Sequence, residues 1–402
     1  MKNVILITNS YPFGNGETYI APELEYANGV ANISIISMIE DKSSKHRKLP
    51  DNVKLLPLKH NKNCKISLII QTILSKPFFK GLVELISNNK LTVLTIKELI
   101  KFVYASKVHY YTIKNSLRYN GINDYSKYIF YSYWMDSTSL SISYFKKYGA
   151  KSVTRCHGGD LYDDRLPWNH QFLRKYITEH VDFVCPVSIQ GKEYLDKRIG
   201  FHDNVIAMHL GVLDHGVGTY DDSKIPIIVS CSSIIPLKRI ELIIDALSQV
   251  KSKYKWIHFG DGPDFDKIKK LAFEKLDDKS FEFKGNRNNQ EIVQFYKNNN
   301  VRMFINASST EGVPVSIMEA LSLGIPVIAT DVGGVREQIK SGYNGELVDK
   351  NISDKDLAIS IEKILNADKT SYSELRKNSR ASYCNNWSYI ENYSKFYNIL
   401  DI

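Results

Sequence analysis

Two glutamates eight residues apart, Glu311 and Glu319, lie in a segment that is typical of a ligand-binding loop. Glu311 follows an apolar run at 302–307 that predicts a strand, and Glu319 lies within a helix predicted over 314–323. Pro314 suits the first turn of that helix, where its missing N–H costs nothing. The free amides of a helix start favour phosphate, and a carboxylate can accept hydrogen bonds from sugar hydroxyls. The segment therefore predicts a site for a phosphorylated, hydroxyl-rich ligand; the alternative is a surface loop with a glutamate at each end.

The pattern around this pair predicts an α/β domain with a parallel sheet. From residue 225 onward, apolar runs of four to six residues alternate with helical patterns, which is typical of parallel strands covered by helices on both faces. We expect strands at 225–232, 256–259, 281–284, 302–307 and 325–329. Ligands bind beyond the carboxyl ends of such strands, which is where Glu311 falls.

The first half of the chain predicts a second domain of the same class. Strands are expected at 4–8, 33–37, 53–57, 128–132, 152–156 and 183–187, and helices at 18–28, 66–74, 79–87 and 95–117. A Gly- and Asp-rich stretch at 211–224 is interpreted as the linker between the two domains. Two such domains in series predict a ligand-binding cleft between two sets of strand ends.

Positive charge is concentrated in the first domain. The net charge is +9, yet residues 1–210 hold 28 Lys and Arg against 18 Asp and Glu, while residues 211–402 hold 25 against 26. Such asymmetry indicates an anionic partner, which could be a nucleic acid, a membrane surface or a phosphorylated substrate, or else a solvated lysine-rich surface. Nucleic acid is not expected, because no helix-turn-helix, zinc or RNA-binding signature accompanies the charge.

The segment 42–127 combines this positive charge with apolar side chains. It is typical either of a surface that lies on an anionic membrane or of ordinary helices packed on the first sheet with lysines in water. The residues concerned are Lys59, Lys62, Lys65, Lys76, Lys80, Lys101 and Lys107, with Phe78, Phe79, Phe102, Tyr104, Tyr110 and Tyr111.

Composition excludes several other classes of protein. With 43% hydrophobic and 24% charged residues, the 402-residue chain can bury sizeable cores, which excludes disorder, collagen and disulfide scaffolds. The longest strongly apolar stretch, about 66–75, is far shorter than the ~18 residues of a membrane span. The first residues read as a buried strand rather than a signal peptide. Five cysteines without metal spacing indicate reduced thiols, so we expect a cytoplasmic protein, either free or peripheral on the inner face of the cell membrane.

The segment around the two glutamates also resembles a known signature. The string at 308–320 is similar to the E-x7-E signature of retaining nucleotide-sugar glycosyltransferases of family 4. The resemblance continues at 324–330, 333–337 and 342–345 and, upstream, at 230–239 and 260–263. The first half is covered only by its Gly loop and by the string HGGD at 157–160. The sequence is most similar to the branch that builds bacterial surface polysaccharides such as capsule.

The resemblance implies the GT-B fold, which has two Rossmann-like, doubly wound α/β domains facing across a cleft. Residues 1–210 would form the acceptor-side domain, 211–224 the linker and 225–385 the domain that binds the nucleotide-sugar donor. A last segment at 386–402 would cross back onto the first domain.

The resemblance also implies roles for individual residues. Glu319 should hold the donor ribose hydroxyls, Glu311 should face the donor sugar, and Lys238 should neutralise the diphosphate leaving group. His157 should contact the transferred sugar or be a structural histidine, and Asp160 should contact the sugar or acceptor or cap a turn. Further donor-binding positions are Gly14, Gly16, Arg239, Asn286, Gly312, Val313, Pro314 and Val315.

One position departs from the pattern. Many members carry an arginine five residues before the lysine, where this chain has Ser233, so the diphosphate clamp is incomplete unless Arg239 compensates.

The expected reaction is retaining transfer of a sugar from a nucleoside-diphosphate sugar to a glycan or a lipid-linked saccharide. Its transition state resembles an oxocarbenium ion, and negative charge grows on the diphosphate. We expect no cofactor and no obligatory metal, because the sequence lacks a convincing Asp-x-Asp near a strand end. The alternatives are a nucleotide-sugar epimerase or a phosphorylase of similar architecture, or a non-catalytic protein that binds nucleotide or glycan.

Overall fold

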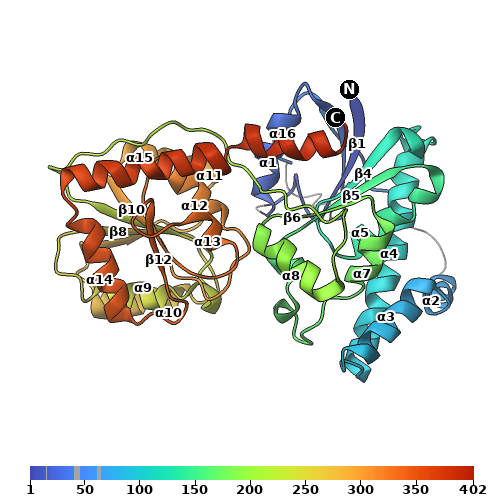
Figure 1. Cartoon of the computed structure of the whole chain (residues 1–402), viewed down its shortest axis with the longest axis horizontal. Coiled ribbons are helices and arrows are strands. Elements are labelled where there is room, and N and C mark those ends of the chain that lie inside the picture. Colours follow the sequence, from blue (N-terminus) through green and yellow to red (C-terminus); the bar gives the residue numbers. More distant parts are fainter. Residues whose placement is uncertain (15, 40–45, 61–64) are drawn as a thin grey trace. The chain divides into compact units, whose positions relative to one another are not determined.

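The structure is a computed structural model that describes residues 1–14, 16–39, 46–60 and 65–402. It divides the chain into two compact units, shown in Figure 1. The first unit comprises residues 1–209 and 393–402, and the second comprises residues 210–392. Each unit is built on one parallel six-stranded sheet.

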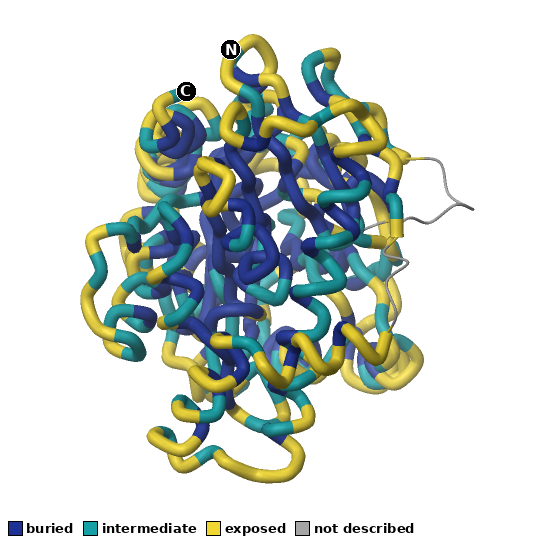
Figure 2. The backbone as a smooth tube through the Cα atoms, turned by 90° about the vertical axis from the view of Figure 1, so that its right-hand side faces the viewer, coloured by how far each residue is buried: buried dark blue, intermediate teal, exposed yellow. Residues whose placement is uncertain are grey.

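The first unit has the strand order β3-β2-β1-β4-β5-β6, which is the order of a doubly wound Rossmann-like sheet. Strand β1, near the middle of the sheet, is buried from residue 4 onward and pairs with β2 on one side and β4 on the other. Figure 2 shows these strands as a buried core wrapped by more exposed segments. The strands are β1 (Lys2–Thr8), β2 (Ala31–Ser37), β3 (Val53–Leu55), β4 (Tyr128–Ser132), β5 (Lys151–Cys156) and β6 (Phe183–Pro186).

Between β3 and β4 the described residues of the first unit form three α-helices, of which α4 is the longest. A reciprocal pair of hydrogen bonds between Thr92 and Thr95 caps the start of α4. Both preceding helices pack on it. The helices are α2 (Lys65–Ile73), α3 (Lys76–Ser87) and α4 (Val93–Tyr119); the rest of the unit contains α1 (Ala21–Ala27), α5 (Ser137–Ser143), α6 (Gly158–Leu161), α7 (Arg174–His180) and α8 (Ile189–Ile199).

The second unit repeats this topology with the strand order β12-β11-β10-β7-β8-β9. The strands are β7 (Ile227–Cys231), β8 (Lys255–Phe259), β9 (Phe281–Phe283), β10 (Val301–Asn306), β11 (Val327–Thr330) and β12 (Gly345–Val348). The helices are α9 (Ile240–Leu247), α10 (Phe265–Lys275), α11 (Asn289–Asn298), α12 (Val315–Ser322), α13 (Val335–Gln338), α14 (Asp354–Leu365) and α15 (Lys369–Asn386). Two doubly wound, Rossmann-like α/β units are therefore present, as predicted.

The stretch at 211–224, predicted to be the linker, is hydrogen-bonded to the rest of the second unit. The amide of Val212 donates to the carbonyl of Trp387, that of Gly218 to Leu323 and that of Thr219 to Lys297. These contacts fix the backbone of the stretch, which is why it clusters with residues 225–392.

The last helix, α16 (Tyr389–Ile399), carries the chain from the second unit to the first. Its Phe396 is fully buried, with its ring 5.2 Å from that of Tyr131 and 4.0 Å from the guanidinium of Arg155. Arg155 is itself completely buried, donates to the hydroxyl of Tyr131 at 2.7 Å and lies 3.5 Å from the carboxylate of Glu23. The end of the chain thus closes the core of the first unit around a buried charge.

We predict that Phe396→Ala lowers the free energy of unfolding by about 3–5 kcal/mol, because it opens a cavity and removes the ring over the Arg155 guanidinium. Urea unfolding measures this loss. Lys395→Ala, an exposed neighbour on the same helix, should change stability by less than about 0.5 kcal/mol. Equal effects of the two substitutions would contradict the packing described here.

Candidate functional site

Glu311 lies in the loop between β10 and α12, and its Oε1 atom accepts three hydrogen bonds. Lys238 Nζ donates at 2.6 Å, Ser308 Oγ at 2.6 Å and Asn306 Nδ2 at 3.2 Å. The side chains of Glu311 and Lys238 are 11% and 23% exposed, so the ion pair is shielded but within reach of a ligand. Lys238 follows β7 and Glu311 follows β10, and these strands are neighbours in the sheet.

Glu319 lies one helical turn into α12 and is buried. Asn289 Nδ2, from the start of α11, donates a hydrogen bond to its Oε1. Burial raises the pKa of this carboxyl to about 7, although the Asn289 bond opposes the shift. A buried carboxyl with one amide partner has capacity left for hydroxyl donors.

The loop between the two glutamates ends at the start of α12. Pro314 is the N-cap and Val315 the first helical residue, so the helix begins one residue later than predicted. Val313 and Pro314 are buried, whereas Gly312 and Val315 are partly exposed. The first amides of α12 have no intrahelical acceptors, which makes this end of the helix suited to an anion.

Gly333 holds the loop in place from the other side. Its φ of +54° is a conformation that other residues rarely adopt, and a Cβ here would lie 2.1 Å from the carbonyl oxygen of Glu311. The amide of Gly334 donates to the carbonyl of Gly312 at 2.7 Å. The backbone after β11 thus fixes the backbone that carries Glu311.

Arg239, which the sequence predicts as a donor-binding position, is held by backbone carbonyls in the structure. Its guanidinium donates to the carbonyl oxygens of Ala307, Ser308 and Lys350. These bonds brace the loop after β10. Asn286 is exposed in the loop that follows β9.

The Gly loop of the first unit folds around a carboxylate that the sequence did not single out. Glu17 is buried and accepts hydrogen bonds from the amides of Asn9, Ser10 and Tyr11 and from the indole N–H of Trp134. The carbonyls of Gly14 and Gly16 accept from the guanidinium of Arg47.

His157 caps the short helix α6 at the carboxyl end of β5. Its ring lies among three aromatic rings, with centroids 4.6 Å from Trp134, 5.0 Å from Tyr133 and 5.8 Å from Tyr19. Both ring nitrogens are buried, and neither has a hydrogen-bond partner among the residues that the structure describes. Burial, with the nearby Arg155 charge, lowers the pKa of His157 to about 3. The imidazole is therefore neutral at physiological pH.

The carboxylate of Asp160 bonds two backbone segments of the site. Its Oδ1 accepts from the amide of His157 at 2.5 Å and its Oδ2 from the amide of Met135 at 2.6 Å. Burial raises its pKa to about 7, against the opposing charge of Arg174. These two bonds join the loops that follow β4 and β5, so the carboxylate has a positioning role.

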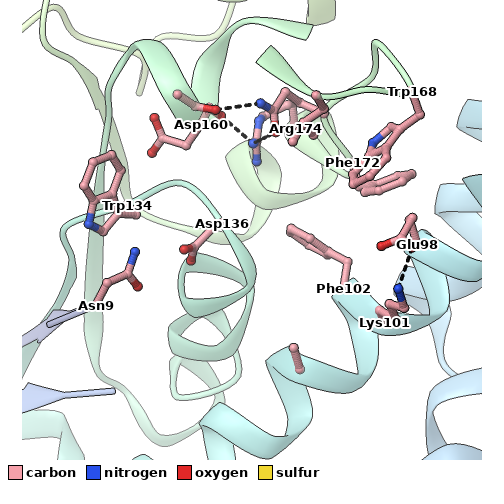
Figure 3. A pocket seen from close by; sticks show the side chains of 14 residues that line it. Asn9, Glu98, Lys101, Phe102, Trp134, Asp136, Asp160, Trp168, Phe172 and Arg174 are labelled. Carbon is pink, nitrogen blue, oxygen red and sulfur yellow. Dashed lines mark hydrogen bonds and ion pairs between the residues drawn. The ribbon is translucent and has the colours of Figure 1, made fainter. Parts of the chain in front are cut away.

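A cavity of about 460 Å³ opens beside Asp160 at the carboxyl ends of β1, β4 and β5. Figure 3 shows Trp134, Asp136 and Asp160 along one side and Phe102, Phe172 and Trp168 along the other. The mixture of flat aromatic rings and carboxylates is typical of a site for a polyhydroxylated ligand.

Three residues of the candidate sites, Asn289, Glu17 and Trp134, were not predicted from the sequence. Asn289 could have been noticed as part of an Asn-Asn pair at a helix start, but nothing local points to Glu319, 30 residues away. Glu17 and Trp134 meet across 117 residues. Within the described residues, no group of three or more His, Cys, Asp or Glu is arranged to hold a metal ion.

Comparison with known families adds the decisive observation for the second unit. Residues 220–382 match the family described as "Glycosyl transferases group 1". The matched residues make up most of the second unit and include both glutamates, Lys238, Asn289 and Gly333.

Relatives of known sequence include glycosyltransferases. An uncharacterized glycosyltransferase of Methanocaldococcus jannaschii is 28% identical over 225 residues, which cover 56% of this chain and 60% of that protein. The lipopolysaccharide 1,6-galactosyltransferase of Escherichia coli is 37% identical over 112 residues, which cover 27% of this chain and 31% of the relative. The matched segments thus span 60% and 31% of the lengths of these two relatives.

Solved structures match over the whole chain and show the fold. The apo form of the lipopolysaccharide outer core galactosyltransferase WaaB has a TM-score of 0.67 at 19% identity, with 98% of both chains covered. HepE of Anabaena in complex with UDP-glucose has a TM-score of 0.67 at 14% identity, with 100% of both chains covered. The predicted GT-B fold is confirmed.

Gly333 offers a test of how the second unit holds the loop that carries Glu311. Gly333→Ala should destabilise the chain by more than Gly342→Ala, although both positions have positive φ. At Gly342 (φ +73°) an added Cβ meets nothing within 4 Å, so only the backbone cost of about 1–2 kcal/mol applies. At Gly333 the methyl group must also displace the Glu311 backbone. Urea unfolding of both variants makes the comparison, and equal losses would contradict it.

Proposed function

We propose that the chain is a retaining glycosyltransferase that moves a sugar from a nucleoside-diphosphate sugar to a glycan or lipid-linked saccharide in bacterial surface-polysaccharide synthesis. One observation carries the proposal: two shielded carboxylates and a lysine surround the start of α12, inside the segment that matches group 1 glycosyl transferases. The activity of the E. coli relative, a lipopolysaccharide galactosyltransferase, supports the class of pathway.

The donor would lie on the second unit. Glu319 would accept hydrogen bonds from the ribose hydroxyls, and the amides at the start of α12 would face the diphosphate. Lys238, now paired with Glu311, would share its charge with the diphosphate. UDP is the first nucleotide to try, because a structural neighbour with the same fold binds UDP-glucose.

The chemistry needs charge at two points. As the bond between the sugar and the diphosphate breaks, negative charge grows on the phosphate oxygens, and Lys238 and the α12 amides stabilise it. Positive charge grows on the sugar ring, and the Glu311 carboxylate stabilises it. In the retaining scheme the acceptor attacks the face that the diphosphate leaves, and a donor phosphate oxygen takes the acceptor proton. Neither a metal ion nor an enzyme nucleophile is required.

The acceptor sugar would lie on the first unit, in the cavity beside Asp160. Trp168 and Phe172 offer ring faces for a sugar, and the carboxylate of Asp136 accepts hydroxyl hydrogen bonds. With a pKa of about 3, His157 is neutral at physiological pH and only a weak base, so its role would be that of an uncharged hydrogen-bond partner.

Nucleotide binding tests the donor site. We expect UDP, or another of GDP, ADP, CMP and dTDP, to raise the unfolding temperature; ligand at 100 times its Kd adds about 2.7 kcal/mol. Glu319→Gln should abolish the shift. Without ligand, Glu319→Gln should be at least as stable as the parent. The substitution removes a carboxyl group whose charged form is disfavoured by burial. If no nucleotide shifts the transition, a non-catalytic or acceptor-first protein becomes the better interpretation.

The raised pKa of Glu319 predicts a pH dependence of nucleotide affinity. The ionised carboxylate accepts the ribose hydroxyls, so affinity should fall as pH drops below about 7 and level off above it. The residual affinity of Glu319→Gln should lack this component, while ionisation of the nucleotide itself contributes equally to both proteins. Calorimetry between pH 6 and 8 measures the difference. Identical profiles would remove Glu319 from the ribose site.

Turnover of the donor tests Glu311. Glu311→Gln should lower sugar transfer on the order of 100-fold or more while leaving UDP affinity within a few fold, because its charge acts chiefly in the transition state. Glu274→Gln, an exposed glutamate of the same domain, is the matched control. A fully active Glu311→Gln would overturn the role proposed for Glu311.

The same turnover assay distinguishes the alternative enzyme. Release of an epimerised free sugar from the donor alone would identify an epimerase instead.

A further inference from the structure

Exposed apolar side chains are concentrated on one small part of the first unit. Of the 24 large hydrophobic residues that are exposed in the described part of the chain, 11 lie between Ile66 and Leu94. They belong to α2, α3, the start of α4 and the short connections between these helices, and we call them the 66–94 face. Scattered exposed hydrophobic residues are ordinary, but such a concentration marks an interaction surface.

Helix α2 carries its apolar stripe on the outside. Ile66, Ile69, Ile70 and Ile73 follow the i, i+3, i+4, i+7 spacing of one helical face, and all four are 41–68% exposed. The side that packs on α4 instead presents buried Leu68 and Thr72. An amphipathic helix normally buries its apolar stripe, so α2 is oriented in the opposite way.

Helix α3 repeats the arrangement. Phe79, Val83 and Ile86 are 53–61% exposed on its outer side. Its inner side is held tightly, because Gly81 packs so close to Leu99 of α4 that a Cβ would lie 2.5 Å from a leucine methyl. The outer side therefore cannot be turned inward without breaking this contact.

The charged residues of the 66–94 face are positive. Lys76 and Lys80 are exposed within α3, as is Lys65 at the start of α2. The nearby acidic side chains are largely shielded from solvent. Glu84 is 18% exposed and accepts a hydrogen bond from the amide of Leu173. Glu98 is 16% exposed and forms an ion pair with Lys101 at 2.6 Å. A surface that combines aliphatic side chains with exposed lysines is complementary to anionic lipid.

The aromatic residues that the sequence suggested for such a surface mostly face elsewhere. Phe78 and Tyr110 are buried, and Phe102 lines the cavity beside Asp160. Lys62 lies outside the described residues. The exposed apolar surface is mainly aliphatic, with Phe79 as its aromatic member.

We propose that the 66–94 face docks the protein on an anionic lipid bilayer, with α2 and α3 lying along the surface and their outer side chains among the lipid headgroups and acyl chains. No single described helix is long and apolar enough to cross a membrane; α2 and α3 together reach the length and composition but are bent by 52°. Because their inner sides are packed on α4, only the outer sides are available to lipid.

A second copy of the chain fits this face less well. Self-association through the 66–94 face would bring the lysines of two copies together, and like charges at an interface are costly. Anionic lipid would neutralise the same lysines.

Vesicle co-sedimentation of the full chain tests the proposal. The protein should bind vesicles of phosphatidylglycerol and phosphatidylcholine, and much less those of phosphatidylcholine alone. Ile70→Glu/Phe79→Glu should weaken binding on the order of tenfold or more, since it places two charges against lipid. Ile359→Glu/Phe273→Glu, equally exposed positions of the second unit, should bind as the parent does.

Charge is tested separately with a matched pair of double variants. Lys76→Glu/Lys80→Glu should abolish the preference for anionic vesicles, whereas Lys251→Glu/Lys355→Glu, exposed in the second unit, should keep it. Unchanged circular dichroism and unfolding temperature, and unchanged nucleotide binding, would show that fold and donor site are intact. Equal binding by parent and Ile70→Glu/Phe79→Glu would overturn the proposal. So would a protein that binds no vesicles but forms a dimer that Ile70→Glu/Phe79→Glu dissolves.

Discussion

A parallel sheet brings the carboxyl ends of all its strands to one edge, and both candidate sites depend on this constraint. In the second unit, β7 and β10 are neighbours in the sheet, so Lys238 reaches Glu311 across 73 residues of sequence. In the first unit the same constraint joins the loops after β1, β4 and β5 around Glu17, Trp134 and His157. The close approach of Gly333 to the Glu311 backbone then fixes the loop more finely than the strands alone could.

Burial gives the ionisable groups of these sites their character. Loss of solvent raises the pKa of Glu319 and of Asp160 and lowers that of His157, because burial always disfavours the charged form. The consequences differ with the partners. Both oxygens of Asp160 accept backbone amides, which ties its carboxylate to the fold, whereas Glu319 has one amide partner and capacity for a ligand. In the free protein, burial disfavours the charged form of the Glu319 carboxyl group, and hydrogen bonds from ligand hydroxyls can stabilise that form. Such a perturbed group is typical of a binding residue.

Local patterns predicted much of the fold and the core of the site, while long-range geometry did not follow from them. The Glu311–Glu319 string carries its own strand, loop and helix start, so sequence alone could predict it. The contact of Asn289 with Glu319 depends on how α11 packs beside α12, which no spacing encodes. Arg239 follows Lys238 in sequence, yet its left-handed backbone (φ 48°) turns the guanidinium toward loop carbonyls. Periodicity identified α2 as amphipathic but could not say which side faces the protein, because that depends on the packing of α4.

Helix α4 connects the two proposals made for the first unit. On one side Leu99 receives Gly81 of α3, which anchors the proposed lipid-facing surface. Its immediate neighbours Glu98, Lys101 and Phe102 line the cavity proposed for the acceptor sugar. A lipid-linked saccharide has its lipid in the bilayer and its sugar in water, so a docking surface and a sugar pocket built on one helix suit such a substrate. The first unit would then bind near both the lipid and the sugar of the acceptor. Docking would also confine the protein to the membrane surface on which the acceptor diffuses, so that the two meet in two dimensions rather than three.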